Sequence, residues 1–402
     1  MKQVYLMIYD LGGGHRNTAN ALRDEIKQRN LPWQVHIVEF FRDIVGTDAP
    51  HKVYNDFVLK KKWARIINEP LLVPSFKLQV RLCHARWRRL LETYWQNHQP
   101  DLVISVLPYV NRVINESLKT NLPNVPFITH PIDLADSPPH FWIEPQEQLL
   151  ICPSELMSQQ AQKLGYSEEL IIRTSGAVVN PRFYEPITLD RRSEKQRLGL
   201  DPDLPTGLVM FGGYGSNVMA KIANSIEQSS LNIQLIFICG HDERVAEILT
   251  AMPSRLPRLV KKFTKEIPYY MHLSDFFIGK PGPTNMSEAL LKNLPVITEC
   301  NALTLFQERY NTKWIAENKF GIVVDDFGNI NQAVAELIEP ENFARYQSNI
   351  KAYNNQAVFE VVDSLETILE TSPVEDCLNS SIRRLINIEK AIANNQEEVI
   401  IS

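Results

Sequence analysis

The start of the chain places a strand, a glycine-rich turn and a helix in immediate succession. An apolar run, Val4–Tyr9, is typical of a buried strand, and it leads into Asp10–Ala19 with three consecutive glycines. Apolar residues then recur at helical spacing over roughly Asn17–Gln28. Glycine lets a ligand approach the backbone because no Cβ intervenes, and a helix N-terminus attracts negative charge. The opening therefore predicts an α/β domain whose first loop binds a ligand.

His15 follows directly after Gly13 and Gly14. A positive charge is disfavoured near a helix N-terminus, so the imidazole is expected to be neutral and able to accept a proton as a general base. Two other interpretations remain. His15 could simply cap the helix or contact an anion. The turn could also bind NAD, with Glu39 on the ribose, although that motif needs glycine where Asn17 stands.

Two series of strand-like runs alternate with helical patterns along the 402 residues. The expected strands are Val4–Tyr9, Val35–Phe40, Leu102–Val106, Pro126–Thr129 and Leu149–Cys152, then Gly207–Phe211, Gln234–Cys239, Phe276–Lys280, Val296–Glu299 and Gly321–Val324. Such alternation is typical of parallel sheets, and the length favours two domains. We expect two α/β domains facing each other across a cleft, with the boundary near the prolines and charges of Asn180–Pro205.

Composition excludes several classes. The net charge of -5 argues against a general nucleic-acid binder. The five cysteines contain no CxxC pair, so neither a zinc site nor a disulfide framework is indicated, and a reducing compartment fits. No signal peptide is recognised, and no apolar run approaches the roughly 20 residues that cross a bilayer. We therefore expect a cytoplasmic protein that meets a membrane from one side.

Residues 50–95 interrupt the alternation. They hold ten lysines and arginines and far fewer acids, interleaved with aromatic residues; the most concentrated part contains Lys60, Lys61, Lys62, Trp63 and Arg65. A basic amphipathic stretch suits the surface of an anionic membrane. The alternatives are a solvated helix whose apolar face packs on the sheet, and a nucleic-acid contact.

A proline-broken segment, Thr129–Trp142, follows the fourth expected strand. It carries two histidines and two aspartates, His130, Asp133, Asp136 and His140. A metal site is one interpretation, but the prolines leave no helical register to present the four together. We expect instead a wall of the cleft, in which Asp133 or His130 holds an acceptor hydroxyl or orients His15.

The second half has its own glycine turn, Gly212, Gly213 and Gly215 with Ser216, before a helix expected at Val218–Glu227. This arrangement favours a diphosphate, although a plain tight turn would look the same.

A further strand–turn–helix corner runs from Lys280 to Glu288. Glu288 could grip two vicinal hydroxyls, such as those of a ribose, or could close a capping box with Asn285. Gln307, Glu308 and Asn311 on the next loop could bind sugar hydroxyls, or could simply be polar surface residues.

Together these loops resemble the GT-B glycosyltransferases, in particular the monogalactosyldiacylglycerol synthase family, and beyond it the diacylglycerol glucosyltransferases and MurG-type transferases. The resemblance covers about residues 3–370. It rests on Gly12–His15 with Ala19, Asp133, Pro139–Trp142, Gly176–Phe183, Gly212, Gly213 and Gly215, Cys239 and Gly240, Met271, Ser274 and Asp275, Lys280–Pro283 with Glu288 and Ala289, and Gln307, Glu308 and Asn311. Tyr214 stands where the galactolipid enzymes have a glutamate.

The resemblance implies an inverting transfer of a hexose, galactose in this family, from a UDP-sugar to a lipid hydroxyl such as that of diacylglycerol. It makes His15 the general base with Asp133 as a second catalytic residue, and it places Gly13, Gly14, His130 and Trp142 at the acceptor. The implied donor residues are Gly212, Gly213, Gly215, Ser216, Gly240, Lys280, Gly282, Pro283, Thr284, Glu288, Gln307, Glu308 and Asn311. No cofactor and no metal are implied.

The implied division is an acceptor domain at 1–183, a donor domain at 184–340, a returning helical segment at 341–370 and a tail at 371–402. A different hydroxylated lipid or a soluble metabolite remains open as acceptor. A UDP-sugar epimerase and a catalytically silent binding subunit are the alternatives to a transferase.

Overall fold

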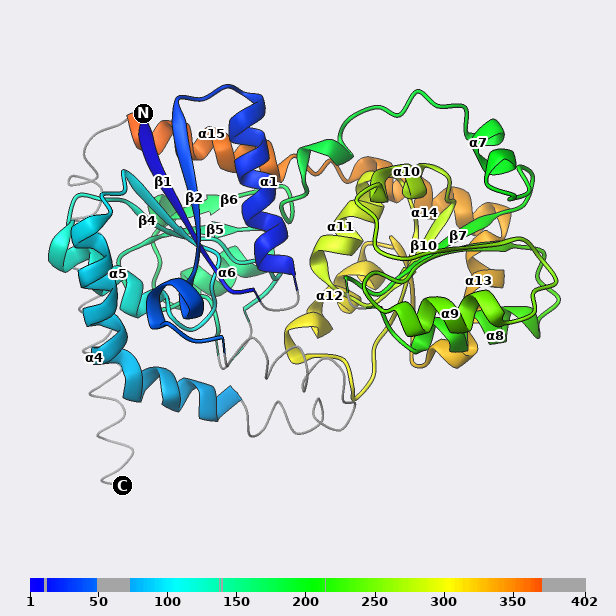
Figure 1. The fold of residues 1–402 in the computed structure, drawn as a ribbon, viewed down its shortest axis with the longest axis horizontal. Helices are drawn as coiled ribbons and strands as arrows, with labels where there is room; N and C mark the ends of the chain where they lie inside the picture. The colour runs from blue at the N-terminus through cyan, green and yellow to red at the C-terminus, as the bar shows by residue number, and fades with distance from the viewer. Residues whose placement is uncertain (11–12, 49–72, 137, 139, 214, 371–402) are drawn as a thin grey trace. The chain divides into compact units, whose positions relative to one another are not determined.

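The computed structural model describes residues 1–10, 13–48, 73–136, 138, 140–213 and 215–370 (Figure 1). The chain forms two compact units. Unit 1 comprises Met1–Val178 and the described residues from Gln356 onward, and unit 2 comprises Val179–Asn355. The chain therefore passes into unit 2 once and returns to unit 1 near its end.

Unit 1 is built on a six-stranded sheet with the order β2-β1-β3-β4-β5-β6, in which every pair is parallel. The strands are β1 (Lys2–Ile8), β2 (Trp33–Glu39), β3 (Leu102–Ser105), β4 (Phe127–Thr129), β5 (Leu149–Cys152) and β6 (Ile171–Arg173). The helices are α1 (Gly14–Gln28), α4 (Val73–Asn97), α5 (Asn111–Asn121), α6 (Glu155–Lys163) and α15 (Ala357–Glu370), with short helical turns at Phe40–Val45 and Glu168–Leu170.

Helices cover both faces of this sheet, which is why its central strands are mostly apolar on both faces. All of Val4–Ile8 is buried, with alternate side chains entering opposite faces. On one face Trp87 and Trp95 of α4 pack among the aromatic residues of the core. The returning helix α15 packs beside α1, as Figure 1 shows. Arg29, at the end of α1, joins the two helices because its guanidinium donates to the Glu366 carboxylate at 3.0 Å.

Unit 2 repeats the plan with the strand order β12-β11-β10-β7-β8-β9, again all parallel. Its strands are β7 (Thr206–Met210), β8 (Gln234–Ile238), β9 (Arg258–Lys261), β10 (Phe276–Gly279), β11 (Val296–Glu299) and β12 (Gly321–Val324). Its helices are α7 (Arg191–Arg197), α8 (Val218–Glu227), α9 (Glu243–Ala251), α10 (Ile267–His272), α11 (Pro283–Leu291), α12 (Phe306–Glu317), α13 (Ile330–Ile338) and α14 (Pro340–Ala352), with short turns at Pro181–Phe183 and Phe327–Asn329.

Alternate residues of the strands of unit 2 divide between two cores. Val209 and Phe237 pack with α8, α9 and α13, whereas Leu208 and Ile236 pack with α10, α11 and α12. A parallel sheet buried on both faces holds the ends of its strands rigidly. The loops that follow β7, β8, β10 and β11 therefore share one firm edge.

Each of the ten expected strands overlaps a strand of the structure, with ends shifted by at most two residues. The prediction missed β6 and β9. Both are edge strands: β6, Ile-Ile-Arg, is too short to stand out from a loop, and β9, Arg-Leu-Val-Lys, has a charged residue at each end. The first helix begins at Gly14 rather than near Asn17, so His15 lies in its first turn. Among the helices of the described residues, none is long and apolar enough to cross a membrane.

Candidate active site

His15 is fixed by a backbone carbonyl that follows a different strand. Gly13 adopts a φ of 91° immediately before α1, and the turn places His15 at the carboxyl end of β1. Its Nδ1 lies 2.6 Å from the carbonyl oxygen of Val106, just beyond β3. Because a carbonyl oxygen can only accept, we assign the proton to Nδ1. The Nε2 atom is then the unprotonated nitrogen that can take a proton from a substrate.

The surroundings keep the ring neutral. Burial lowers the pKa of His15 to about 4, against smaller opposing effects of Val106 and Asp10. The ring centroids of Tyr9 and Trp142 each lie 6.0 Å from that of the imidazole. The neutral state was expected from the helix N-terminus, but in the structure its main cause is desolvation.

The segment after β4 folds around a buried carboxylate. Asp136 accepts hydrogen bonds from the backbone amides of Phe141, Trp142 and Ile143, at 2.6, 3.2 and 2.8 Å. This turn carries Trp142 towards His15, and the indole Nε1 donates to Asp133 Oδ2 at 3.0 Å. Asp133 therefore holds Trp142, and the Trp142 ring lies beside the His15 ring. The described residues contain no group of three or more His, Cys, Asp or Glu that could hold a metal ion.

His130 is a second neutral imidazole at this edge of the sheet. Its Nδ1 lies 2.9 Å from the carbonyl oxygen of Pro131, so by the same reasoning the proton is on Nδ1. Burial lowers its pKa to about 4. Its Nε2 is buried and has no hydrogen-bond partner among the described residues. A hydroxyl that donates to this nitrogen would satisfy it.

The glycine turn of unit 2 packs backbone against backbone. Gly212 and Gly215 have φ angles of 78° and 61°, and the amide of Gly215 donates to the carbonyl of Gly212 at 3.3 Å. The turn after β8 lies against it, since the amide of His241 donates to the carbonyl of Gly213 at 2.8 Å. Gly240 was expected at the donor site only through the resemblance. The structure shows that it supports this turn.

Replacing Gly240 by alanine should disrupt the turn. A Cβ at this position would lie 2.2 Å from the carbonyl oxygen of Gly213, and the φ of 60° is itself unfavourable for alanine. We expect a loss of stability of several kcal/mol, by analogy with strongly strained substitutions, and weaker binding of UDP. Thermal unfolding and titration calorimetry measure the two effects. Gly199→Ala is the matched control, because Gly199 also has a positive φ, 75°, but has no atom within 4 Å of the added Cβ. Equal losses in both variants would contradict the packing argument.

Glu288, in the corner after β10, does not form the capping box with Asn285 that the sequence allowed. Helix α11 begins at Pro283 with Gly282 as the preceding cap residue, so Asn285 lies inside the helix and no capping box forms. Glu288 follows one turn later and is buried, and burial raises the pKa of its carboxyl to about 8 despite the positive charge of Arg182. A buried carboxyl without a structural role in capping is a candidate binding group.

Gln307, Glu308 and Asn311 lie in the first turns of α12 rather than on a loop. Glu308 Oε1 pairs with Lys280 Nζ at 3.1 Å, and Asn311 Nδ2 donates to the carbonyl of Pro281 at 2.9 Å. The start of α12 and the corner after β10 are thus joined directly. Since β7, β8, β10 and β11 are neighbours in the sheet, the predicted donor residues of unit 2 gather at one edge.

The predicted membrane contact lies outside the described residues; it comprises Lys60, Lys61, Lys62, Trp63 and Arg65. The carbonyl of Val106, which holds His15, could not be predicted from the sequence, because every residue has the same backbone carbonyl.

Comparison with known proteins agrees with the resemblance seen in the motifs. No family model matches the chain. It is 27% identical over 399 residues to a probable monogalactosyldiacylglycerol synthase 3 from Oryza sativa subsp. japonica, covering 95% of this chain and 77% of that protein. It is 26% identical over 391 residues to monogalactosyldiacylglycerol synthase 1 from Arabidopsis thaliana, covering 92% of this chain and 71% of that protein.

The solved structures that resemble this fold include MurG from Acinetobacter baumannii, at a TM-score of 0.58 and 13% identity, covering 91% of this chain and all of that one. The Anabaena protein HepE, solved with UDP and glucose, matches at a TM-score of 0.56 and 15% identity over 92% of this chain and all of the other. The fold is therefore GT-B, as predicted. The predicted class of enzyme, a glycosyltransferase, is also confirmed, and among named enzymes the chain is similar to the monogalactosyldiacylglycerol synthases.

Proposed function

We propose that this protein transfers a hexose, galactose, from a UDP-sugar to the free hydroxyl of diacylglycerol with inversion at the anomeric carbon. The observation that carries the proposal is the neutral His15, whose Nδ1 is held by the carbonyl of Val106 so that Nε2 can accept a proton. The relatives in sequence are named as galactolipid synthases, and HepE was solved with UDP and glucose. These names support the choice of lipid acceptor and UDP-sugar donor.

The reaction needs a base on the acceptor and charge stabilisation on the leaving group. His15 Nε2 takes the proton of the hydroxyl as its oxygen bonds to the anomeric carbon. The bond from that carbon to the phosphate oxygen breaks, and UDP leaves with the electron pair. Asp133 keeps Trp142 beside the base through the indole nitrogen. The buried Nε2 of His130 accepts a hydrogen bond from an acceptor hydroxyl.

Unit 2 supplies the donor groups in this proposal. Backbone amides of the turn Gly212–Ser216, at the start of α8, stabilise the diphosphate without a metal. Glu288 accepts hydrogen bonds from the ribose hydroxyls. Gln307 and Glu308 bind the sugar, with Lys280 holding the Glu308 carboxylate in place.

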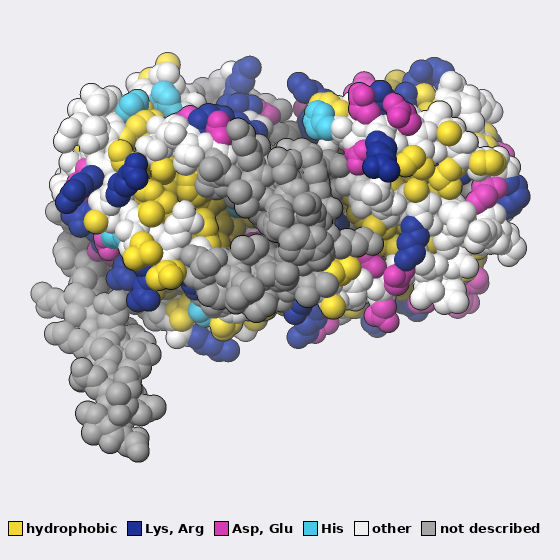
Figure 2. All heavy atoms as spheres, turned by 60° about the horizontal axis from the view of Figure 1, so that its bottom comes forward, with side chains coloured by type: hydrophobic (Ala, Val, Ile, Leu, Met, Phe, Trp, Pro, Cys, Tyr) yellow, Lys and Arg dark blue, Asp and Glu magenta, His cyan; other side chains and the backbone are white. Residues whose placement is uncertain are grey.

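The exposed face of α4 supports a lipid acceptor. Leu78 and Leu82 are 55% and 76% exposed, although large apolar side chains are normally covered. Arg81, Arg86 and Arg89 are exposed at helical spacing on the same face. On the left of Figure 2, over unit 1, hydrophobic side chains gather with basic ones around them. Such a surface suits an anionic membrane, into which leucines insert while arginines contact lipid phosphates.

Leu82→Asp should weaken binding to anionic vesicles by about tenfold, because it removes an exposed leucine that inserts into the membrane and adds a negative charge that anionic lipids repel. Co-sedimentation with vesicles containing phosphatidylglycerol measures the effect. Leu189→Asp is the control, since Leu189 is 50% exposed in unit 2 and lies outside this face. If both variants bind as the wild type does, α4 is not a membrane contact.

The proposed function is tested by incubating purified protein with individual UDP-hexoses and diacylglycerol in anionic vesicles. UDP release and the mass of the lipid product are followed together. A monohexosyl product with UDP-galactose is the expected result. A product only with UDP-glucose would correct the donor, whereas release of UDP without a lipid product would correct the acceptor. No UDP release from any donor would overturn the proposal.

A further inference from the structure

A cavity of about 320 Å³ lies in unit 2, away from the predicted donor residues. Its lining includes Pro205, just before β7, and Asp275, just before β10. These two strands are parallel neighbours, so the cavity lies at their amino ends. The glycine turn and the Lys280 corner follow the carboxyl ends of the same strands. The cavity is therefore a separate site at the opposite edge of the sheet.

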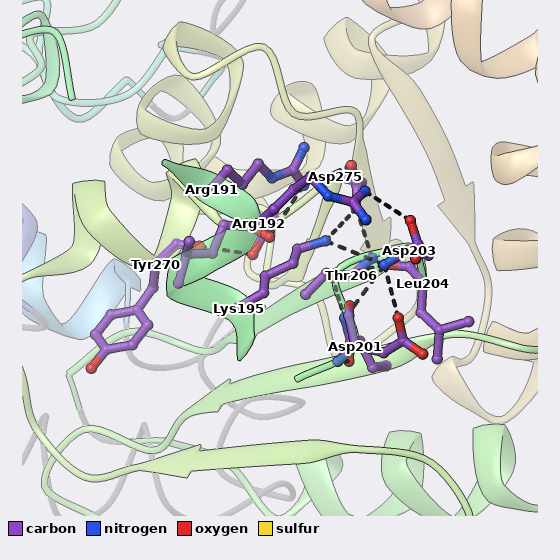
Figure 3. Close-up of polar contacts among 12 residues, drawn as sticks. Arg191, Arg192, Lys195, Asp201, Asp203, Leu204, Thr206, Tyr270 and Asp275 are labelled. Carbon is purple, nitrogen blue, oxygen red and sulfur yellow. Dashed lines mark hydrogen bonds and ion pairs between the residues drawn. The ribbon is translucent and has the colours of Figure 1, made fainter. Parts of the chain in front are cut away.

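Positive side chains dominate the polar part of this cavity. One turn of α7 contributes Arg191, Arg192 and Lys195, and Figure 3 shows them close to Asp203 and Asp275. Arg192 Nη1 pairs with Asp203 at 2.7 Å, and Arg191 Nη2 pairs with Asp275 at 2.7 Å. The lining thus holds three cations and two carboxylates, and Asp190 and Asp201 also act electrostatically on Arg192, so an anion would be held by unused hydrogen-bond donors and not by an excess of charge.

The donors of two of these cations are only partly used. Lys195 is buried, yet the closest partners of its Nζ are the carbonyl of Leu204 at 3.3 Å and Asp275 at 3.7 Å. An ammonium group has three protons to donate. Arg191 Nε is buried and has no hydrogen-bond partner within the described part of the chain. Desolvated cations with unused donors are costly, and an anion in the cavity would compensate them.

The walls of the cavity are held in place before any ligand binds. Gln234 braces the loop before β7: its Nε2 donates to the carbonyl of Asp201 at 2.6 Å and to Thr206 Oγ1 at 2.9 Å. The apolar part of the lining includes Ile338 at the end of α13 and Phe343 on α14. A rigid wall lowers the entropic cost of binding.

We propose that this cavity binds a phosphate monoester, with the phosphate on Arg191, Arg192 and Lys195 and the alcohol against Ile338 and Phe343. Two guanidinium groups and an ammonium suit a tetrahedral anion with several oxygens. The volume is at the lower end of the range for small-molecule sites, so the part that enters is small. The same chemistry is offered by a soluble phosphate ester and by the headgroup of a phosphomonoester lipid.

Titration calorimetry tests the proposal with inorganic phosphate and glycerol 3-phosphate as probes. UDP is kept at saturation so that the proposed diphosphate turn is occupied, and chloride keeps the ionic strength constant. We expect glycerol 3-phosphate to bind the wild type and Arg192→Gln to weaken it at least about tenfold, the effect of one lost charge-assisted hydrogen bond. Arg197→Gln is the matched control. Arg197 lies on the same helix, is 60% exposed where Arg192 is 61%, and pairs with Glu194 outside the cavity.

A vesicle arm distinguishes the two sources. If the wild type binds phosphatidic acid vesicles more tightly than phosphatidylglycerol vesicles of equal surface charge, and both Arg192→Gln and added glycerol 3-phosphate abolish that difference, the ligand is a lipid headgroup. If only the soluble probes bind, it is a free ester. Lys195→Met, checked by circular dichroism for folding, should also lose binding. Failure of both probes to bind, or equal affinity in Arg192→Gln and the wild type, would show that the cluster only holds the loop and would overturn the proposal.

Discussion

His15→Ala should lower kcat for sugar transfer by about 10²–10⁴-fold, the usual contribution of a positioned general base. The KM for the UDP-sugar should change little, because the predicted donor residues are in unit 2. Rates of UDP release with diacylglycerol as acceptor measure both constants. His36→Ala is the control, since His36 is a half-buried histidine of the same unit on β2. A His15→Ala variant that keeps kcat within a few-fold of the wild type would remove His15 from the mechanism.

The pH dependence gives a second readout of the same group. The neutral imidazole is the active form, and its pKa is lowered to about 4, so kcat/KM should stay level down to about pH 5 and fall near pH 4. The stability of the folded protein also falls as the pH is lowered. The folded-state pKa lies below the unfolded value of about 6.5, so the unfolded chain binds more protons between these values. The stabilisation is complete above about pH 6.5 and is lost as the pH falls towards 4. Circular dichroism at each pH separates unfolding from protonation of the base.

Glu288→Ala should raise the KM for the UDP-sugar by about 10–100-fold, as expected when charge-assisted hydrogen bonds to two hydroxyls are lost. The residue is buried in α11 and takes no part in a capping box. Donor KM measured at saturating acceptor tests this. Glu317→Ala is the control, because Glu317 is an exposed acid at the end of α12. Unchanged donor KM in Glu288→Ala would exclude the proposed ribose contact.

Proton linkage tests the same contact independently. Burial raises the pKa of the Glu288 carboxyl to about 8, so much of it is protonated at neutral pH in the free protein. Hydroxyls that donate to a carboxylate favour the ionised form. Binding of UDP should therefore release protons, and its affinity should rise as the pH increases towards 8. Calorimetry in two buffers of different ionisation enthalpy measures the release, which Glu288→Gln should abolish while it preserves the shape of the side chain.

The local elements of the fold could be predicted because their signals are local. Apolar runs such as Leu102–Val106 predicted strands, and glycines followed by a helical pattern predicted the two turns near Gly13 and Gly212. The misses have equally physical causes. The strand β9 is a half-buried edge strand, and its arginine and lysine hide the pattern. The beginning of α1 at Gly14 was missed because glycine has a poor helix propensity.

The sequence alone determined the α/β class and the two parallel-sheet series, and it predicted most residues of the candidate site. Only the tertiary structure decided how those residues act. The carbonyl that orients His15 is 91 residues away along the chain, and Gly240 matters because the backbone of Gly213 lies against it. The pKa values of His15 and Glu288 are likewise set by burial among groups from other elements. Spacing and propensity depend on neighbours in sequence, whereas desolvation, hydrogen bonding and steric contact depend on neighbours in space.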